Sequence, residues 1–221
     1  MPNPGMSKPA AHPSQSSRPR PRIVVALTGA SGAINGIRLL ETLRRLELAE
    51  THLIITTLGK RTISTETDWS VAQVARLADA VHDNSDLGAP PASGSFRTAG
   101  MFVTPCSLKT LAAVASGIGD SLAVRAADVT LKEGRPLLLL VRETPLHVGH
   151  LRQMVAVAEA GAIVMPPVPA FYERPRTIDD LVDHTVRRAI ERLGLAPDLV
   201  REWDGAPPPD PTNHTAGSGR Q

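Results

Sequence analysis

The sequence contains a single cysteine, Cys106, so an internal disulfide is excluded. One unpaired cysteine is typical of a protein of the reducing cytoplasm, which is the location we expect. Long apolar runs are also missing. The longest aliphatic stretch covers residues 137–141, whereas a membrane-spanning helix needs about 20 apolar residues. The composition therefore excludes a disulfide miniprotein and a zinc finger, and it predicts no membrane segment.

Neither sign of charge is in clear excess over the chain. There are 24 basic and 22 acidic residues, a formal net charge of +2. Residues 1–22 hold four of the basic residues and none of the acidic ones, so the remainder carries a small negative excess. A nucleic-acid-binding surface on the folded part is therefore not predicted.

The 221 residues divide into two polar ends and a central body. Residues 1–21 and 205–221 are rich in proline, serine and small residues, and they have too few large apolar side chains to offset the entropy lost on ordering. We predict that both ends are disordered. The first end has no apolar core of a signal peptide. Residues 22–204 are predicted to form one domain.

The body alternates between strand-like and helix-like segments. Strands are predicted at residues 22–28, 52–57, 101–104, 137–141 and 162–165. Helices are predicted at 33–48, around 63 and then at 71–80, 108–116, 121–131, 146–160 and 178–193, with Asp120 as the N-cap of the helix at 121–131. This alternation predicts an α/β fold with a parallel sheet. Because ligands bind at the carboxyl ends of such strands, we expect the site in the loops that follow them.

A glycine-rich loop follows the first predicted strand and leads into a helix. Gly29 and Gly32 permit a tight turn, and Ser31 adds a hydroxyl donor next to the start of the helix. The second predicted strand ends at Thr57 without the acidic residue that a dinucleotide ribose needs. The loop therefore favours a mononucleotide phosphate over NAD. A glycine turn that only packs the helix onto the sheet is the alternative.

A second predicted helix start, at residues 107–110, offers another anion site. Ser107 and Thr110 supply hydroxyl groups and Lys109 supplies a positive charge next to the free N–H groups of the first turn. Ser107 as a plain N-cap is the alternative interpretation.

Several loops together resemble one known family. The segments are GASGA at 29–33, STETD at 64–68, DNSDLGAPPASGSF at 83–96, PCSLKTLA at 105–112, RAADVTLKE at 125–133, RETPL at 142–146 and MPPVPAFYERP at 165–175. In this order and spacing they resemble the flavin prenyltransferases (UbiX-like), over roughly residues 22–204. Asn35 departs from the family pattern, because an aromatic residue is common at that position.

The resemblance implies a three-layer Rossmann- or flavodoxin-like single domain that assembles into a homo-oligomer, a dodecamer. It implies a transferase that joins the dimethylallyl group of dimethylallyl monophosphate to N5 and C6 of reduced FMN, without a metal. The product, prenylated FMN, is then the cofactor of a UbiD-like decarboxylase, which is the expected acceptor.

The resemblance also implies binding residues. Those expected to bind the flavin are Gly29, Ala30, Ser31, Thr56, Ser107, Leu108, Lys109, Thr110 and Arg142. Those expected at the phosphate of the prenyl donor are Arg125, Lys132, Tyr172 and Arg188, with Trp203 closing over the site. The spacing of seven residues between Arg125 and Lys132 places both on one face of a helix. Exposed surface arginines and a core tyrosine are the alternatives.

Glu143 is the expected catalytic acid. A carboxyl group among phosphates is repelled as an anion, which favours the protonated form that a proton donor needs. We expect it to protonate the departing phosphate, with Ser31 relaying a proton near flavin N5 and Glu66 in the same network. An ion pair between Glu143 and Arg142 or Arg125 is the alternative.

Two other functions remain open from the sequence. One is an FMN-dependent decarboxylase of a cysteine derivative with the same fold, and the other is a non-catalytic FMN-binding subunit of a decarboxylase. Cys106 is interpreted as a small buried thiol, because no histidine is adjacent to it. His147 and His150 have a spacing compatible with a metal, but the sequence offers no third ligand, and no metal is expected.

Overall fold

Six strands form one parallel sheet in the computed structural model, which describes residues 19–200. They are β1 (Arg22–Leu27), β2 (Glu50–Ile55), β3 (Ala80–His82), β4 (Gly100–Cys106), β5 (Leu137–Val141) and β6 (Ile163–Val164). The strand order is β3-β2-β1-β4-β5-β6, and every neighbouring pair is parallel. The direction of winding reverses between β1 and β4, as in Rossmann-type sheets, where this point opens a crevice for ligands.

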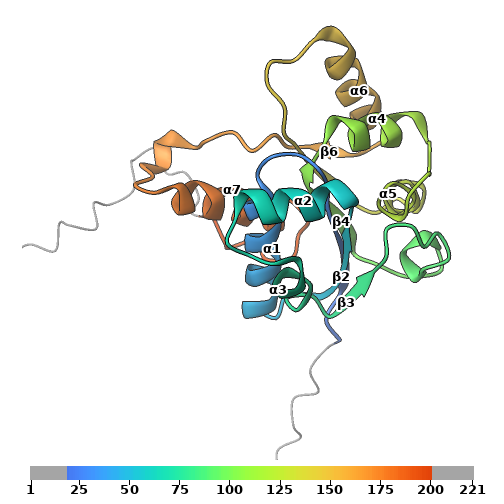
Figure 1. Cartoon of the computed structure of the whole chain (residues 1–221), viewed down its shortest axis with the longest axis horizontal. Helices are drawn as coiled ribbons and strands as arrows, with labels where there is room; N and C mark the ends of the chain where they lie inside the picture. The colour runs from blue at the N-terminus through green and yellow to red at the C-terminus, as the bar shows by residue number, and fades with distance from the viewer. Residues whose placement is uncertain (1–18, 201–221) are drawn as a thin grey trace, which may run out of the picture.

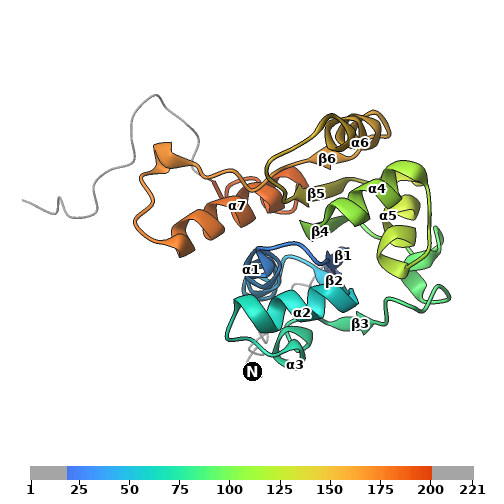
Figure 2. The same ribbon diagram turned by 45° about the horizontal axis from the view of Figure 1, so that its top comes forward.

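Helices cover both faces of the sheet, which confirms the three-layer α/β prediction (Figures 1 and 2). One apolar core holds the side chains of α1 (Ala33–Arg45) and α7 (Ile178–Arg192), with α2 (Thr57–Glu66) and α3 (Val71–Ala75) beside them. The second core lies against α4 (Leu108–Ser116), α5 (Leu122–Lys132) and α6 (Val148–Glu159). Two short 3-10 turns, Pro90–Ala92 and Phe171–Glu173, lie in the connections. Within residues 19–200, every helix is too short or too polar to cross a membrane.

Several predicted boundaries change for local reasons. The strand predicted at 52–57 ends at Ile55, because Thr56 caps α2 by accepting a hydrogen bond from the backbone N–H of Gly59 at 3.0 Å. The helix predicted at 33–48 ends at Arg45, and the one predicted at 146–160 spans Val148–Glu159 with His147 as its N-cap. The prediction of Asp120 as an N-cap is wrong, because Ser121 holds that position.

The strand β3 is absent from the sequence prediction, which placed a helix over 71–80. The helix there stops at Ala75, and Ala80–His82 pairs with β2 instead. Three residues are too few to produce the alternation that identifies a strand. The folded part also begins earlier than residue 22: the Arg20 side chain pairs with Asp79 at 2.9 Å.

Gly36 lets α1 lie against the sheet at the centre of the fold. A Cβ atom at this position would lie 2.5 Å from the backbone oxygen of Thr104 and 2.8 Å from Cγ of Leu27. Neither atom moves without shifting a central strand or its packing. The close contact between α1, β1 and β4 therefore requires glycine here, as helix–strand packing does in nucleotide-binding folds.

We expect Gly36→Ala to lower the free energy of unfolding by about 2 kcal/mol, because overpacking outweighs the helix propensity that alanine gains. Gly119→Ala is the matched control. Its new methyl group would have no atom closer than 3.8 Å outside its chain neighbours, so we expect a change within about 0.5 kcal/mol. Urea unfolding followed by circular dichroism measures the free energy of unfolding of each variant. Equal values for the two variants would contradict the claim that the contact between α1 and the sheet requires glycine at position 36.

Candidate active site

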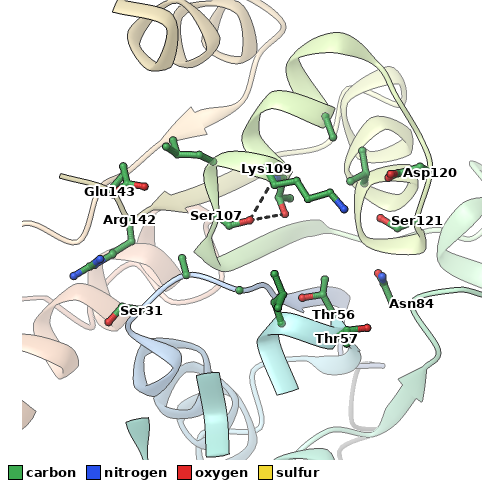
Figure 3. A pocket seen from close by; sticks show the side chains of 17 residues that line it. Ser31, Thr56, Thr57, Asn84, Ser107, Lys109, Asp120, Ser121, Arg142 and Glu143 are labelled. Carbon is green, nitrogen blue, oxygen red and sulfur yellow. Dashed lines mark hydrogen bonds between the residues drawn. The ribbon is translucent and has the colours of Figure 1, made fainter. Parts of the chain in front are cut away.

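A cavity of about 480 Å³ opens at the carboxyl ends of the strands, where the winding of the sheet reverses. Its volume lies within the usual range for a small-molecule site. The lining residues come from the loops after five strands and from the starts of α2, α4 and α5 (Figure 3). They are Gly29, Ala30, Ser31, Thr56, Thr57, Leu58, Asn84, Ser107, Leu108, Lys109, Thr110, Ala113, Asp120, Ser121, Val124, Arg142 and Glu143. All nine residues predicted to bind the flavin are among them.

The loop after β1 forms the floor of the cavity and packs tightly against the start of α2. A Cβ atom on Gly29 would lie 2.2 Å from Cβ of Leu58, so only glycine fits there. Thr28, which is buried, ties this loop to the loop after β4. Its hydroxyl donates to the backbone oxygen of Pro105 at 2.7 Å and accepts from the N–H of Ser107 at 2.8 Å. The two central loops of the cavity are thus held in a fixed relation.

The start of α4 supplies hydroxyl groups and one cation. The Ser107 hydroxyl accepts from the backbone N–H of Thr110 at 3.3 Å and lies 3.1 Å from its hydroxyl. The N-cap interpretation of Ser107 is therefore confirmed, and it coexists with a place in the cavity wall. Lys109 extends along the cavity toward Asp120 and Ser121 (Figure 3). Within residues 19–200 Lys109 forms no ion pair, so its positive charge remains available to an anion.

Arg142 and Glu143 follow β5 and line the other end of the cavity, on the same side as Ser31 (Figure 3). One carboxylate oxygen of Glu143 accepts a hydrogen bond from the backbone N–H of Thr144 at 3.0 Å. In the described part of the chain, Glu143 forms no ion pair with Arg142 or Arg125. The carboxyl group is therefore placed at the cavity without the ion pair that the sequence left as an alternative.

Glu66 does not line the cavity. Its carboxylate accepts hydrogen bonds from the backbone N–H groups of Gly32 at 2.8 Å and Ala33 at 3.2 Å. It therefore occupies the start of α1, where its negative charge is stabilised by the helix dipole. The sequence prediction of a phosphate at these N–H groups needs correction, because the donors already have a partner. A role of Glu66 in proton transfer stays a prediction.

Four residues expected at the donor phosphate lie outside the cavity of their own chain. The side chain of Arg125 pairs with Asp128 and donates to the backbone oxygen of Ala92. Lys132 pairs with Glu133 and lies beside Gly94. Arg125 and Lys132 therefore face the same segment, as their spacing predicted.

The other two members of this set belong to the end of the chain. Tyr172 lies on the segment before α7, with its hydroxyl 3.4 Å from Nε2 of His184, and Arg188 pairs with Glu191 on α7. The segment carrying Tyr172 reaches away from the sheet (Figure 1). Trp203 lies outside the described residues. One chain alone therefore does not bring Lys132, Tyr172 and Arg188 to Glu143.

Sequence reasoning missed several residues that line the cavity, among them Thr57, Asn84, Asp120 and Ser121. Asn84 was missed because it follows β3, the strand that the sequence pattern did not reveal. Thr57 was assigned to a strand rather than to the exposed start of α2. Two signals were available: Asn84 lies within the segment at 83–96 that carries the family resemblance, and a polar residue after each strand of a parallel sheet lies at the same edge.

His147 and His150 lie against each other at the start of α6, with their ring centroids 3.4 Å apart and the rings tilted by 31°. His147 also caps the helix by accepting from the backbone N–H of His150. In residues 19–200 no three histidine, cysteine or acidic side chains gather closely enough to hold a metal ion. The contacts of the two histidines are those of a helix N-cap and its first turn.

Burial raises the pKa of the Cys106 thiol to about 12. Because the thiolate is the reactive form, a pKa this high leaves almost none of it near neutral pH. We expect native protein at pH 8 to react with a thiol-specific disulfide reagent about a thousandfold more slowly than the protein unfolded in urea. Absorbance of the released thiolate follows both reactions, and rapid labelling of the native chain would contradict the buried assignment.

Comparisons with known proteins agree with this architecture. The family described as Flavoprotein matches residues 11–190. The flavin prenyltransferase UbiX of Escherichia coli (strain K12) is 51% identical over 187 residues, which cover 84% of this chain and 99% of that protein. The chain thus matches nearly the full length of this relative.

Two solved structures are similar over the whole fold. AnUbiX (PadA1), in complex with FMN and dimethylallyl pyrophosphate, matches with a TM-score of 0.82 and 51% identity, over 85% of this chain and 99% of that one. A dodecameric FMN-dependent UbiX-like decarboxylase from Escherichia coli O157:H7 matches with a TM-score of 0.81 and 48% identity, over 83% and 100%.

Proposed function

Because the chain belongs to the UbiX flavin prenyltransferases within the flavoprotein family, we propose that it transfers a dimethylallyl group from dimethylallyl monophosphate to N5 and C6 of reduced FMN. The observation that carries this proposal is the cavity itself. It lies at the reversal point of the sheet, and all nine residues expected at the flavin line it, with Glu143 at one end.

The two ends of the cavity differ in a way that suits FMN. Lys109, with its unpaired charge, lies near the hydroxyl-rich starts of α2 and α4, which are suited to a phosphate. Ser31, Arg142 and Glu143 lie at the other end, where the ring system would be held. We therefore place the FMN phosphate at the Lys109 end and the reacting atoms near Ser31 and Glu143.

The allylic C–O bond of the donor breaks and phosphate leaves, while C1 of the dimethylallyl group bonds to N5, which loses its proton. Protonation of the remaining C=C bond at C2 then lets C3 bond to C6, which loses its proton, and this closes the new ring. The reduced ring supplies electron density, both as nucleophile and as a π face for the allylic cation. Glu143 donates a proton to the departing phosphate, which makes it a better leaving group. Ser31 accepts the N5 proton or relays it, and Arg142 holds the ring.

We infer that the complete site requires several subunits. On α6, only Val157 is buried, and Val148, Leu151 and Val155 form one exposed apolar face. Val168 and Phe171, on the segment that reaches away from the sheet, are 70% and 74% exposed. A homo-oligomer covers these surfaces and brings Lys132, Tyr172 and Arg188 to the cavity of a neighbouring chain. The dodecameric relative supports a dodecamer.

Prenylated FMN, the proposed product, serves a UbiD-like decarboxylase, which is the acceptor that we propose. We propose the cytoplasm as the compartment, since reduced flavin and a single free thiol both suit reducing conditions. We propose the monophosphate as the donor. Because AnUbiX binds dimethylallyl pyrophosphate, the pyrophosphate is the second donor to test against it.

The test is anaerobic incubation of the protein with reduced FMN and dimethylallyl monophosphate, followed by mass spectrometry of the flavin. The expected result is a flavin heavier by a five-carbon unit, with release of phosphate. Recovery of unchanged FMN that is tightly bound would favour a non-catalytic subunit. Release of CO₂ from a cysteine derivative, with no adduct, would instead favour the decarboxylase.

A further inference from the structure

The start of α5 is held by a residue from another part of the fold. Asn84 accepts hydrogen bonds from two successive N–H groups of the first turn: its backbone oxygen from Leu122 at 2.8 Å, and its Oδ1 from Ala123, 39 residues along the chain, at 3.1 Å. Ser121 holds the N-cap position of α5, but its side chain makes no capping hydrogen bond. Asn84 therefore replaces the local cap.

Asn84 itself is firmly placed. It lies two residues after His82, the last residue of β3, and Nε2 of His82 lies 2.9 Å from Nδ1 of His52 on β2. The two rings stack, and His52 is almost fully buried. The end of β3 is thereby fixed to the rest of the sheet, so Asn84 joins the edge of the sheet to α5.

The amide of Asn84 also lines the cavity, at the Lys109 end (Figure 3). Only the oxygen of an amide accepts a hydrogen bond, so the contact with Ala123 fixes which atom faces α5. The nitrogen keeps both hydrogens without a partner in residues 19–200. Asp120 also lines this end, and its carboxylate would repel a bound phosphate. Hydrogen-bond donors that are neutral or positively charged are therefore needed there to hold the phosphate.

We propose that Asn84 is both a positioning residue and a direct ligand of the flavin phosphate. Its oxygen holds the first turn of α5, and its nitrogen donates to the phosphate next to Lys109. The helix it holds supplies Ser121 and Val124 to the cavity wall and carries Arg125. Asn84 thus couples the phosphate end of the cavity to the helix with the cations expected at the prenyl donor. The inference rests on the proposed binding of FMN.

Asn84→Asp separates the two roles, because a carboxylate still accepts from Ala123 but cannot donate and adds a negative charge. We expect Asn84→Asp to keep a melting temperature close to that of the wild type and to bind FMN about 10- to 100-fold more weakly. Riboflavin lacks the phosphate, so its affinity should change less than about twofold. Asn84→Ala should lower both the melting temperature and the FMN affinity. Ser85→Ala, an exposed neighbour that does not line the cavity, is the control and should behave as wild type.

Fluorescence titrations of FMN and riboflavin with the full-length protein, together with thermal unfolding, measure these effects. Wild-type FMN affinity in Asn84→Asp, or an equal loss for FMN and riboflavin, would overturn the phosphate contact. An unchanged melting temperature in Asn84→Ala would overturn the positioning role. If the wild-type chain itself fails to bind FMN, the proposed function and this inference fall together. If the wild-type chain binds FMN and Asn84→Asp binds it equally well, the proposed function stands and only the proposed contact of Asn84 with the phosphate is overturned.

Discussion

Glu143→Gln is expected to slow formation of the prenyl–flavin adduct by at least about a hundredfold while FMN stays bound, because an amide cannot donate the proton that the departing phosphate needs. The residue lies at the cavity end with Ser31 and Arg142, away from the Lys109 end where the phosphate of FMN is proposed to bind. Its loss should therefore act on the reaction and change the dissociation constant of FMN less than about threefold.

The leaving group gives a sharper readout of the same role. Pyrophosphate departs more readily than phosphate without protonation, so dimethylallyl pyrophosphate should lose less rate in Glu143→Gln than the monophosphate does. Single-turnover mass spectrometry with both donors measures the two losses. Glu47→Gln, an exposed carboxylate outside the cavity, is the control. A Glu143→Gln enzyme with wild-type speed, or with equal losses for both donors, would remove Glu143 as the acid.

Mixed assemblies should regain activity that neither parent variant has. Lys132 lies outside the cavity of its own chain, whereas Glu143 lines it. If a neighbouring subunit supplies Lys132, then Glu143→Gln and Lys132→Ala subunits complement each other. In a random one-to-one assembly about a quarter of the sites receive both intact residues. The mixture should show about a quarter of wild-type activity, against a loss of about tenfold to hundredfold in Lys132→Ala alone.

A second mixture serves as the control. Ser31 and Glu143 line the same cavity of one chain, so Ser31→Ala and Glu143→Gln subunits cannot repair each other. Co-expression with two purification tags isolates the mixed assemblies, and adduct formation is then measured. If the mixture with Lys132→Ala gains nothing over its parents, Lys132 acts within its own chain or not at all. A gain in the Ser31 mixture would show that the cavity itself is shared.

The sequence was most informative where local forces decide the structure. The helix Leu108–Ser116 and the strand Leu137–Val141 were predicted with their observed boundaries. The first begins at a serine cap and ends at a glycine, and the second is a short apolar run. The parallel-strand pattern placed the site in the loops after the strands, and the family resemblance named nine of the residues that line the cavity.

The sequence failed where long-range contacts decide. β3 is a strand only because β2 offers an unpaired edge, and its three residues carry no pattern of their own. Asp120 has the right chemistry for a cap, but Asn84 provides it from a distant segment. The contact of the Glu66 carboxylate with the start of α1 also joins distant segments and has no sequence signal, while the predicted place of Glu66 in the catalytic network stays a prediction.

The amino-acid sequence by itself determined the α/β alternation and the family resemblance, and through that resemblance nine of the residues that line the cavity. The alternation depends on patterns of neighbouring residues, and the resemblance depends on motifs in their order along the chain. The tertiary structure alone decided which donors remain free for a ligand. It paired the start of α1 with Glu66 and left Lys109 unpaired. It also placed Lys132, Tyr172 and Arg188 away from Glu143. Hydrogen bonds and charges find partners through space, and the order of residues along a chain does not specify which ones meet.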